Sequence, residues 1–145
     1  MLTHLSIKNY ALIESLAVNF KDQLSIITGE TGAGKSILLG ALGLVLGKRA
    51  ESSILKDTTQ KCIIEGQFSI ANYNLEAFFE ENDIDFEAET IIRREILPSG
   101  KSRAFINDTP VNLHALSALS DFLIDIHSQH QTLQLTSNDF QFQVI

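Results

Sequence analysis

The sequence predicts an α/β fold in which an antiparallel β subdomain lies beside a core of one strand, one glycine-rich loop and one helix. Two observations carry this prediction. Residues 24–46 read as a short apolar strand, a loop with three glycines and a nearly continuous apolar run of helical length. Residues 61–107 contain short segments of alternating polarity separated by turn residues, which is typical of an antiparallel meander. The length of 145 residues fits a single domain.

The composition is that of a globular protein, because 44% of the residues are hydrophobic and 20% are charged. Cys62 is the only cysteine, so no disulfide forms within the chain, and its apolar surroundings predict a small core residue. The longest apolar stretch is too short to span a bilayer and no charged leader is present, so we expect no membrane association and a cytoplasmic location. The net charge of −7 excludes a protein that binds DNA over its whole surface.

The N-terminal residues predict two strands. Residues 2–8 alternate in polarity with one change of phase, and residues 16–20 alternate cleanly. We expect residues 9–14 to cross over between these two strands. A polar turn at residues 21–23 then leads into the core.

The core begins with residues 24–28, whose apolar and β-branched side chains predict a buried strand. Residues 37–46 are apolar on nearly every side, which predicts a buried helix. Between them, residues 29–36 read G-E-T-G-A-G-K-S, a complete G-x-x-x-x-G-K-[ST] phosphate-binding loop in the strand–loop–helix context that the motif requires. The polar residues 47–59 are expected to form a loop that leaves the helix.

The rest of the chain predicts a meander. Residues 61–70 alternate as a strand with Cys62, Ile64, Gly66 and Phe68 on one face, and residues 74–82 suit a short amphipathic helix. Two further strands, residues 90–97 and 103–106, flank a five-residue hairpin loop with the expected turn residues, and residues 107–110 form a second turn. Asn112 is expected to cap a helix that carries Leu113, Leu116 and Leu119. Residues 122–126 predict another buried strand.

The chemistry of the loop follows from its spacing. Its glycines let successive backbone N–H groups point into one concavity, and the helix that follows adds the positive end of its dipole. Lys35 is expected to reach the β- and γ-phosphates of a nucleoside triphosphate, and the Ser36 hydroxyl to ligate the bridging Mg²⁺. The predicted nucleotide-binding residues are Gly29, Glu30, Thr31, Gly32, Ala33, Gly34, Lys35 and Ser36.

Four segments carry a resemblance to a known family. They are L-S-I-K-N-Y-A-L-I-E at the start, the loop and helix from Thr28 to Ala50, S-R-A-F-I-N-D-T-P-V, and L-I-D-I-H-S-Q-H-Q. In order and spacing they resemble the N-terminal part of the RecN family of SMC-like, ABC-type ATPases, over essentially the whole chain. The resemblance implies a P-loop NTPase fold with an ABC/SMC-type head that is split in two by a long coiled coil. Residues 1–145 are then expected to be the N-terminal lobe of that head.

The same resemblance implies the function and the partners. The function is ATP-dependent action on DNA ends during recombinational repair of double-strand breaks, in the cytoplasm and associated with the nucleoid. The partners are ATP with Mg²⁺, the C-terminal half of the same head, and a second copy joined through ATP sandwiched between heads. DNA is expected to be contacted mainly by parts outside this sequence.

A catalytic residue is also implied. Gln129 resembles the Q-loop glutamine of ABC and SMC heads, whose side-chain oxygen ligates Mg²⁺ or orients the attacking water; Gln131 competes for this role. The resemblance also suggests a place near the nucleotide for Asn9, for which a structural turn is equally compatible.

Two groups that an ABC active site requires are absent from this sequence. It holds neither a signature motif of the L-S-G-G type nor a strand that ends in Asp-Glu, since Asp125 is followed by Ile126 and His127. We therefore expect this segment to bind nucleotide without hydrolysing it alone. The alternative is a self-contained P-loop kinase or NTPase that acts on a small molecule, and a third possibility is a dimerisation module with a vestigial loop.

Basic side chains gather on the predicted hairpin, and two interpretations stay open. They form either a local patch for DNA phosphates or a solvated hairpin whose charges are balanced by Glu87, Glu89 and Glu95. The basic residues are Arg93, Arg94, Lys101 and Arg103.

Overall fold

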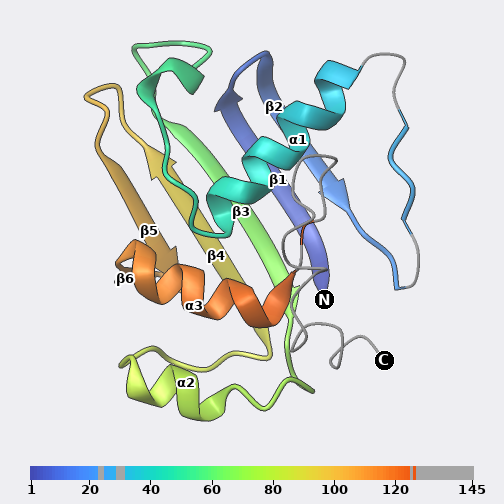
Figure 1. Cartoon of the computed structure of the whole chain (residues 1–145), viewed down its shortest axis with the longest axis vertical. Coiled ribbons are helices and arrows are strands. Elements are labelled where there is room, and N and C mark those ends of the chain that lie inside the picture. The colour runs from blue at the N-terminus through green and yellow to red at the C-terminus, as the bar shows by residue number, and fades with distance from the viewer. Residues whose placement is uncertain (23–24, 29–31, 125, 127–145) are drawn as a thin grey trace, which may run out of the picture.

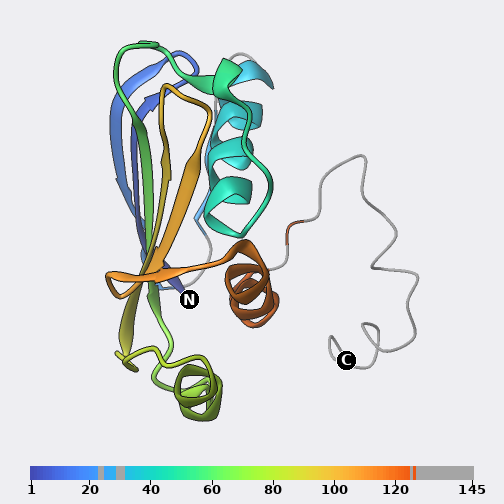
Figure 2. The ribbon, with the colours of Figure 1, turned by 90° about the vertical axis from the view of Figure 1, so that its left-hand side faces the viewer.

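The computed structural model describes residues 1–22, 25–28, 32–124 and 126. Its centre is a six-stranded antiparallel sheet with the strand order β2-β1-β3-β4-β5-β6. Helices α1 and α3 lie on one face of this sheet, and none of the described helices covers the other face (Figures 1 and 2). The short helix α2 lies beyond one end of the strands (Figure 1). No helix in the described residues combines the length and apolarity that a membrane crossing needs.

The elements follow one another along the chain with short connections. They are β1 (Leu2–Tyr10), β2 (Ile13–Asn19), α1 (Gly32–Val45), the 3₁₀ helix η1 (Ser52–Ile54), β3 (Cys62–Ser69), α2 (Glu76–Glu81), β4 (Glu89–Ile96), β5 (Ser102–Ile106), β6 (Thr109–Val111) and α3 (Leu113–Leu123).

The meander predicted between residues 61 and 107 is confirmed. Alternate residues of β3, from Cys62 to Phe68, are buried, and β3 pairs with β4 along its whole length. The turn at Asn107 and Asp108, both with positive φ, joins β5 to β6. Asn112 caps α3 as expected, because its side-chain oxygen accepts a hydrogen bond of 2.8 Å from the backbone N–H of Ala115.

The expected crossover at residues 9–14 is wrong, because β1 and β2 form a tight hairpin in which Tyr10 pairs with Ile13. Asn9 has a structural role in this turn. It has a φ of 54°, and its Nδ2 atom donates to the carbonyl oxygens of Asp57 at 2.9 Å and Gln60 at 3.0 Å. Its side-chain oxygen accepts from the Asp57 N–H at 2.7 Å. Asn9 therefore holds the loop that precedes β3.

Two predicted buried strands are wrong. Residues 25–28 join no strand of the described part, and Ile26 and Ile27 are 76% and 46% exposed. The strand before a phosphate-binding loop normally pairs with parallel neighbours, and the described residues supply only the antiparallel sheet. In the predicted strand 122–126, Phe122 and Leu123 instead continue α3. These residues form a helix and not a strand because Leu116, Leu119 and Leu123 recur with helical spacing on the buried face of α3.

Candidate functional site

The phosphate-binding motif lies at the start of α1, which begins at Gly32. Gly34, Lys35 and Ser36 are exposed in the first turns of this helix. A Cβ added to Gly34 would meet no atom of the described residues within 4 Å, so there is open space beside this glycine. The first turn holds no acidic side chain. A helix N-terminus carries a partial positive charge, and together with an exposed lysine it is suited to an anion.

The structure places only part of the predicted site. Gly32 and Ala33 are the first two residues of α1. The other predicted nucleotide-binding residues of the loop, Gly29, Glu30 and Thr31, lie outside the described residues, as do Gln129 and Gln131.

A pocket of about 300 Å³ lies beside Lys35. Its walls come from β2, from the segment before the loop and from the first half of α1, and they are mostly apolar. This pocket therefore lies between β2 and the first half of α1. The lining residues are Ile13, Leu16, Val18, Ile27, Thr28, Gly34, Lys35 and Leu38.

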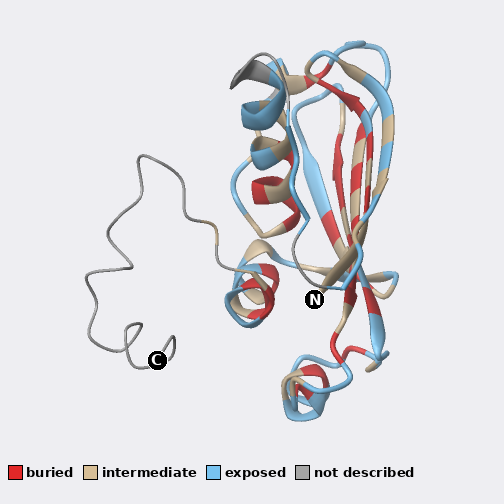
Figure 3. Ribbon diagram, turned by 90° about the vertical axis from the view of Figure 1, so that its right-hand side faces the viewer, coloured by how far each residue is buried: buried red, intermediate tan, exposed pale blue. Residues whose placement is uncertain are grey.

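The second half of α1 is packed firmly onto the sheet. Ala41, Leu44 and Val45 are buried where α1 meets β3 and β4, and Figure 3 shows burial increasing along α1 away from the loop. Nearer its middle, Gly40 faces Tyr10, whose hydroxyl oxygen would lie 2.5 Å from a Cβ at that position. A larger residue than glycine would therefore push Tyr10 or the helix away.

Helix α1 ends at Val45, and Gly47 closes it in a Schellman arrangement. The Lys48 N–H donates to the Gly43 carbonyl oxygen at 3.0 Å and the Gly47 N–H to that of Leu44 at 3.2 Å. Gly47 has a φ of +97° and packs on α3, where an added Cβ would lie 3.2 Å from the Cα atom of Ser117. Both its backbone conformation and this close approach require glycine.

Arg94, on β4 of the sheet, binds the same end of α1 through hydrogen bonds. Its guanidinium is fully buried, and Nη1 donates to the carbonyl oxygens of Leu44 at 2.8 Å and Lys48 at 3.0 Å. Nη2 donates to the Ser102 hydroxyl at 3.3 Å. Burial lowers the pKa of Arg94. The surface interpretation of Arg94 is therefore wrong, because the alternation of β4 turns it to the core side together with Ile92 and Ile96.

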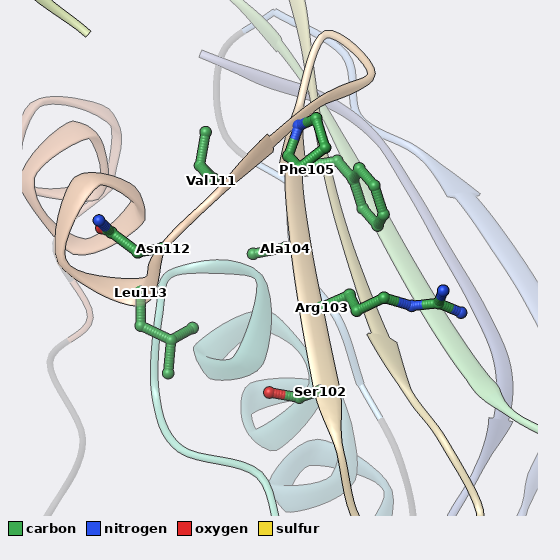
Figure 4. A pocket seen from close by; sticks show the side chains of 8 residues that line it. Ser102, Arg103, Ala104, Phe105, Val111, Asn112 and Leu113 are labelled. Carbon is green, nitrogen blue, oxygen red and sulfur yellow. The ribbon is translucent and has the colours of Figure 1, made fainter.

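The sequence analysis missed this role of Arg94. The available signal was a single charged residue at an inward position of an alternating strand, between two isoleucines. Figure 4 shows the residues of the neighbouring strand β5 that line a pocket of about 430 Å³. The Ser102 and Ala104 side chains lie on the same side of β5 as α1, whereas Arg103 and Phe105 point to the opposite side (Figure 4).

Arg93 and Arg103, two of the remaining cations of the hairpin, are matched by acidic groups. Glu95 accepts from Arg103 at 2.9 Å and pairs with Lys61 at 3.2 Å. Arg93 pairs with Asp108 at 2.8 Å and stacks over the Phe105 ring. These pairs favour the balanced, solvated hairpin over a patch for DNA phosphates.

Comparison with known proteins identifies relatives over nearly the whole chain. Residues 1–128 match the family described as the RecF/RecN/SMC N terminal domain. The chain is 42% identical over 146 residues to the DNA repair protein RecN of Vibrio cholerae and 39% identical over 149 residues to that of Haemophilus influenzae. Both alignments cover 100% of this chain, which spans only 26% and 27% of these two relatives.

Solved structures with a similar fold are head domains. The SMC head bound to the C-winged helix domain of ScpA matches with a TM-score of 0.69 and 19% identity, over 88% of this chain and 42% of that one. A structure from work on ATP-driven dimerization and DNA-stimulated activation of SMC ATPases matches with a TM-score of 0.68 and 17% identity. That match covers 99% of this chain and 95% of the other. At these identities the likeness shows the fold.

Proposed function

The chain belongs to the RecF/RecN/SMC N-terminal domain family, and from this premise we propose that it is the ATP-binding N-terminal half of a RecN-like ATPase. The complete protein would act in recombinational repair of DNA double-strand breaks. The exposed Lys35 at the start of α1, in a first turn without acidic side chains, is the observation that carries the nucleotide-binding part of the proposal. The family and the SMC-type head fold expected from the sequence are both confirmed.

The residues at the start of α1 fit a triphosphate with Mg²⁺. No acidic side chain in the first turn opposes an anion, and among the described residues there is open space beside Gly34. The backbone N–H groups of residues 29–36 would hold the phosphates, with the Lys35 ammonium on the β- and γ-phosphates. Ser36 and Gln129 would hold the Mg²⁺, which neutralises charge on the phosphate oxygens. Gln129 would also orient the attacking water.

Exposed apolar side chains indicate where the C-terminal half of the head would pack. Ile26 and Ile27 are exposed in the segment before the loop, which pairs with no strand among the described residues, and Leu39 is 44% exposed on α1. Phe122, at the end of α3, is 57% exposed. We call these four residues the apolar face. Residues 1–145 would thus be one lobe, and parallel strands from the other lobe would pair with residues 25–28 and bury the apolar face.

Head dimerisation and DNA contact are parts of the same proposal. One of the structural neighbours comes from work on ATP-driven dimerization of SMC ATPases, which supports a second copy joined through sandwiched ATP. The net charge of −7 and the paired cations of the hairpin support DNA contact mainly outside this chain. The proposed location is the cytoplasm, at the nucleoid. A small-molecule kinase is not favoured, because the relatives are DNA repair proteins.

A turnover experiment tests the half-head. MgATP binding and hydrolysis are measured for this chain alone and after mixing with a separately expressed C-terminal half of a RecN relative. The proposal expects binding by this chain, no turnover above background, and turnover that appears only in the mixture. Robust hydrolysis or phosphoryl transfer by this chain alone would overturn it.

A further inference from the structure

Helix α1 is fixed to the sheet at the end opposite to its proposed ligand. Gly34, Lys35 and Ser36 are exposed at the start of α1. At its other end, Leu44 and Val45 are buried against the sheet (Figure 3). The pocket of about 300 Å³ beside Lys35 lies along the first half of the helix. Within the described residues, Lys35 and Ser36 are therefore carried on a helix whose second half is more deeply buried in the core than its first.

The tie at that second half is a buried guanidinium. Arg94 joins the Leu44 and Lys48 carbonyl oxygens, at the end of α1, to the Ser102 hydroxyl on β5. A planar guanidinium presents its donors in fixed directions, so it restrains the orientation of the helix end as well as its distance from the sheet. Its positive charge also lies at the negative end of the helix dipole.

Stability alone does not explain an arginine at this position. Its neighbours Ile92 and Ile96 on the same face of β4 are apolar and fully buried. The Arg94 Nε atom is buried without a hydrogen bond in the described structure, so its desolvation is only partly compensated. Replacing a buried charged group by an apolar side chain of similar volume is often neutral or stabilising. A role beyond packing is therefore expected of this side chain.

We propose that Arg94 is a positioning residue for nucleotide binding, which fixes the tilt of α1 and thereby the place of Lys35 and Ser36. This inference rests on the proposed function. Nine positions separate Lys35 from Leu44, which is about 14 Å along a helix. A tilt of about 5° at the anchored end would move the loop end by about 1 Å over this length, enough to weaken phosphate contacts.

The test uses two substitutions and one matched control. Arg94→Met keeps the volume and removes the donors, and Arg94→Lys keeps the charge but loses the planar fork. Phe79→Leu is the control, because Phe79 is fully buried in α2 and packs on Phe78 and Phe86, away from α1. For each variant, calorimetry measures MgATP affinity, thermal unfolding measures stability, and amide hydrogen exchange is followed at residues 37–42.

We expect Arg94→Met to bind MgATP about 10-fold more weakly and Arg94→Lys about 3-fold more weakly than the unsubstituted chain. Amide exchange at residues 37–42 should be faster in both, while Phe79→Leu lowers stability and leaves both readouts unchanged. Unchanged affinity in Arg94→Met, or an equal loss in Phe79→Leu, would overturn the inference and leave the proposed function standing. Absence of MgATP binding by the unsubstituted chain would overturn both.

Discussion

The Arg94 Nη1 atom lies 2.8 Å from the carbonyl oxygen of Leu44, and this hydrogen bond joins the inner face of β4 to the last turn of α1. The two residues are 50 positions apart in the chain. The bond therefore links the antiparallel subdomain to the helix that begins with the phosphate-binding motif. Packing of the buried second half of α1 onto β3 and β4 makes the two parts one unit.

Lys35→Ala should weaken MgATP binding by about 10- to 100-fold, because the variant loses a charge-assisted contact to the phosphates. Folding should be preserved, since Lys35 is exposed at the start of α1. Calorimetry on the purified chain measures the affinity. Lys101→Ala is the matched control, because Lys101 is an exposed lysine in the β4–β5 loop. Equal affinity before and after the Lys35 substitution would refute the phosphate assignment.

Gly47→Ala should lower the free energy of unfolding by about 2 kcal/mol, because alanine is strained at positive φ and its Cβ meets backbone atoms that cannot move aside. The Cβ would lie 3.2 Å from both the N and Cα atoms of Ser117 on α3. Gly100→Ala is the control, since Gly100 also has positive φ but lies in an exposed hairpin loop. Urea unfolding should show a loss for Gly47→Ala that exceeds the control by about 1 kcal/mol; equal losses would contradict the contact with α3.

Asn9→Ala should destabilise the chain by about 2–4 kcal/mol, because it removes hydrogen bonds to the loop before β3 and leaves buried backbone groups unpaired. Asn9 itself is 8% exposed and has a φ of 54°. Asn74→Ala is the control. It measures the loss of stability that comes from placing alanine at positive φ alone, because Asn74 has the same φ as Asn9 and is exposed. Chemical unfolding of both variants measures the difference, and a loss no larger than that of Asn74→Ala would show that Asn9 does not organise the loop.

Burial raises the pKa of the Cys62 thiol from 9.0 to about 11. Because the folded state holds this proton more tightly than the unfolded state, the contribution to stability is fully present below pH 9 and is lost as the pH rises towards 11. Urea unfolding between pH 8 and pH 11 should therefore show a steeper alkaline loss in the unsubstituted chain than in Cys62→Ala. Iodoacetamide at pH 8 should modify Cys62 only as fast as the chain unfolds. Rapid alkylation of the folded chain would contradict the burial of the Cys62 thiol.

A charged substitution in the apolar face should leave the stability of this chain unchanged but weaken its association with the C-terminal half of the head. Ile26→Asp is expected to change the free energy of unfolding by less than about 0.5 kcal/mol, because Ile26 is 76% exposed. The same change should weaken association with the C-terminal half of a RecN relative by about 10-fold, measured by calorimetry or light scattering. Leu12→Asp is the control, since Leu12 is 78% exposed in the β1–β2 turn. If Ile26→Asp leaves the association unchanged, the C-terminal half does not pack on the apolar face.

Local patterns account for the features that could be predicted from the sequence. The alternation of Cys62, Ile64 and Phe68 marks the buried face of β3, because the two faces of a strand alternate with every residue. The cap at Asn112 depends on only four consecutive residues. The phosphate-binding motif is likewise local, and the helix expected at residues 37–46 is present, although α1 begins earlier, at Gly32.

The sequence by itself therefore determined the meander, the helix that follows the loop and the family to which the chain belongs. Tertiary structure decided the features that depend on a distant partner. Residues 25–28 have strand-like composition but join no strand of the described part, because a strand forms only where a neighbour supplies its hydrogen bonds. Arg94 is charged yet buried, because its guanidinium donates hydrogen bonds to carbonyl groups at the end of α1, among them that of Leu44, 50 positions away.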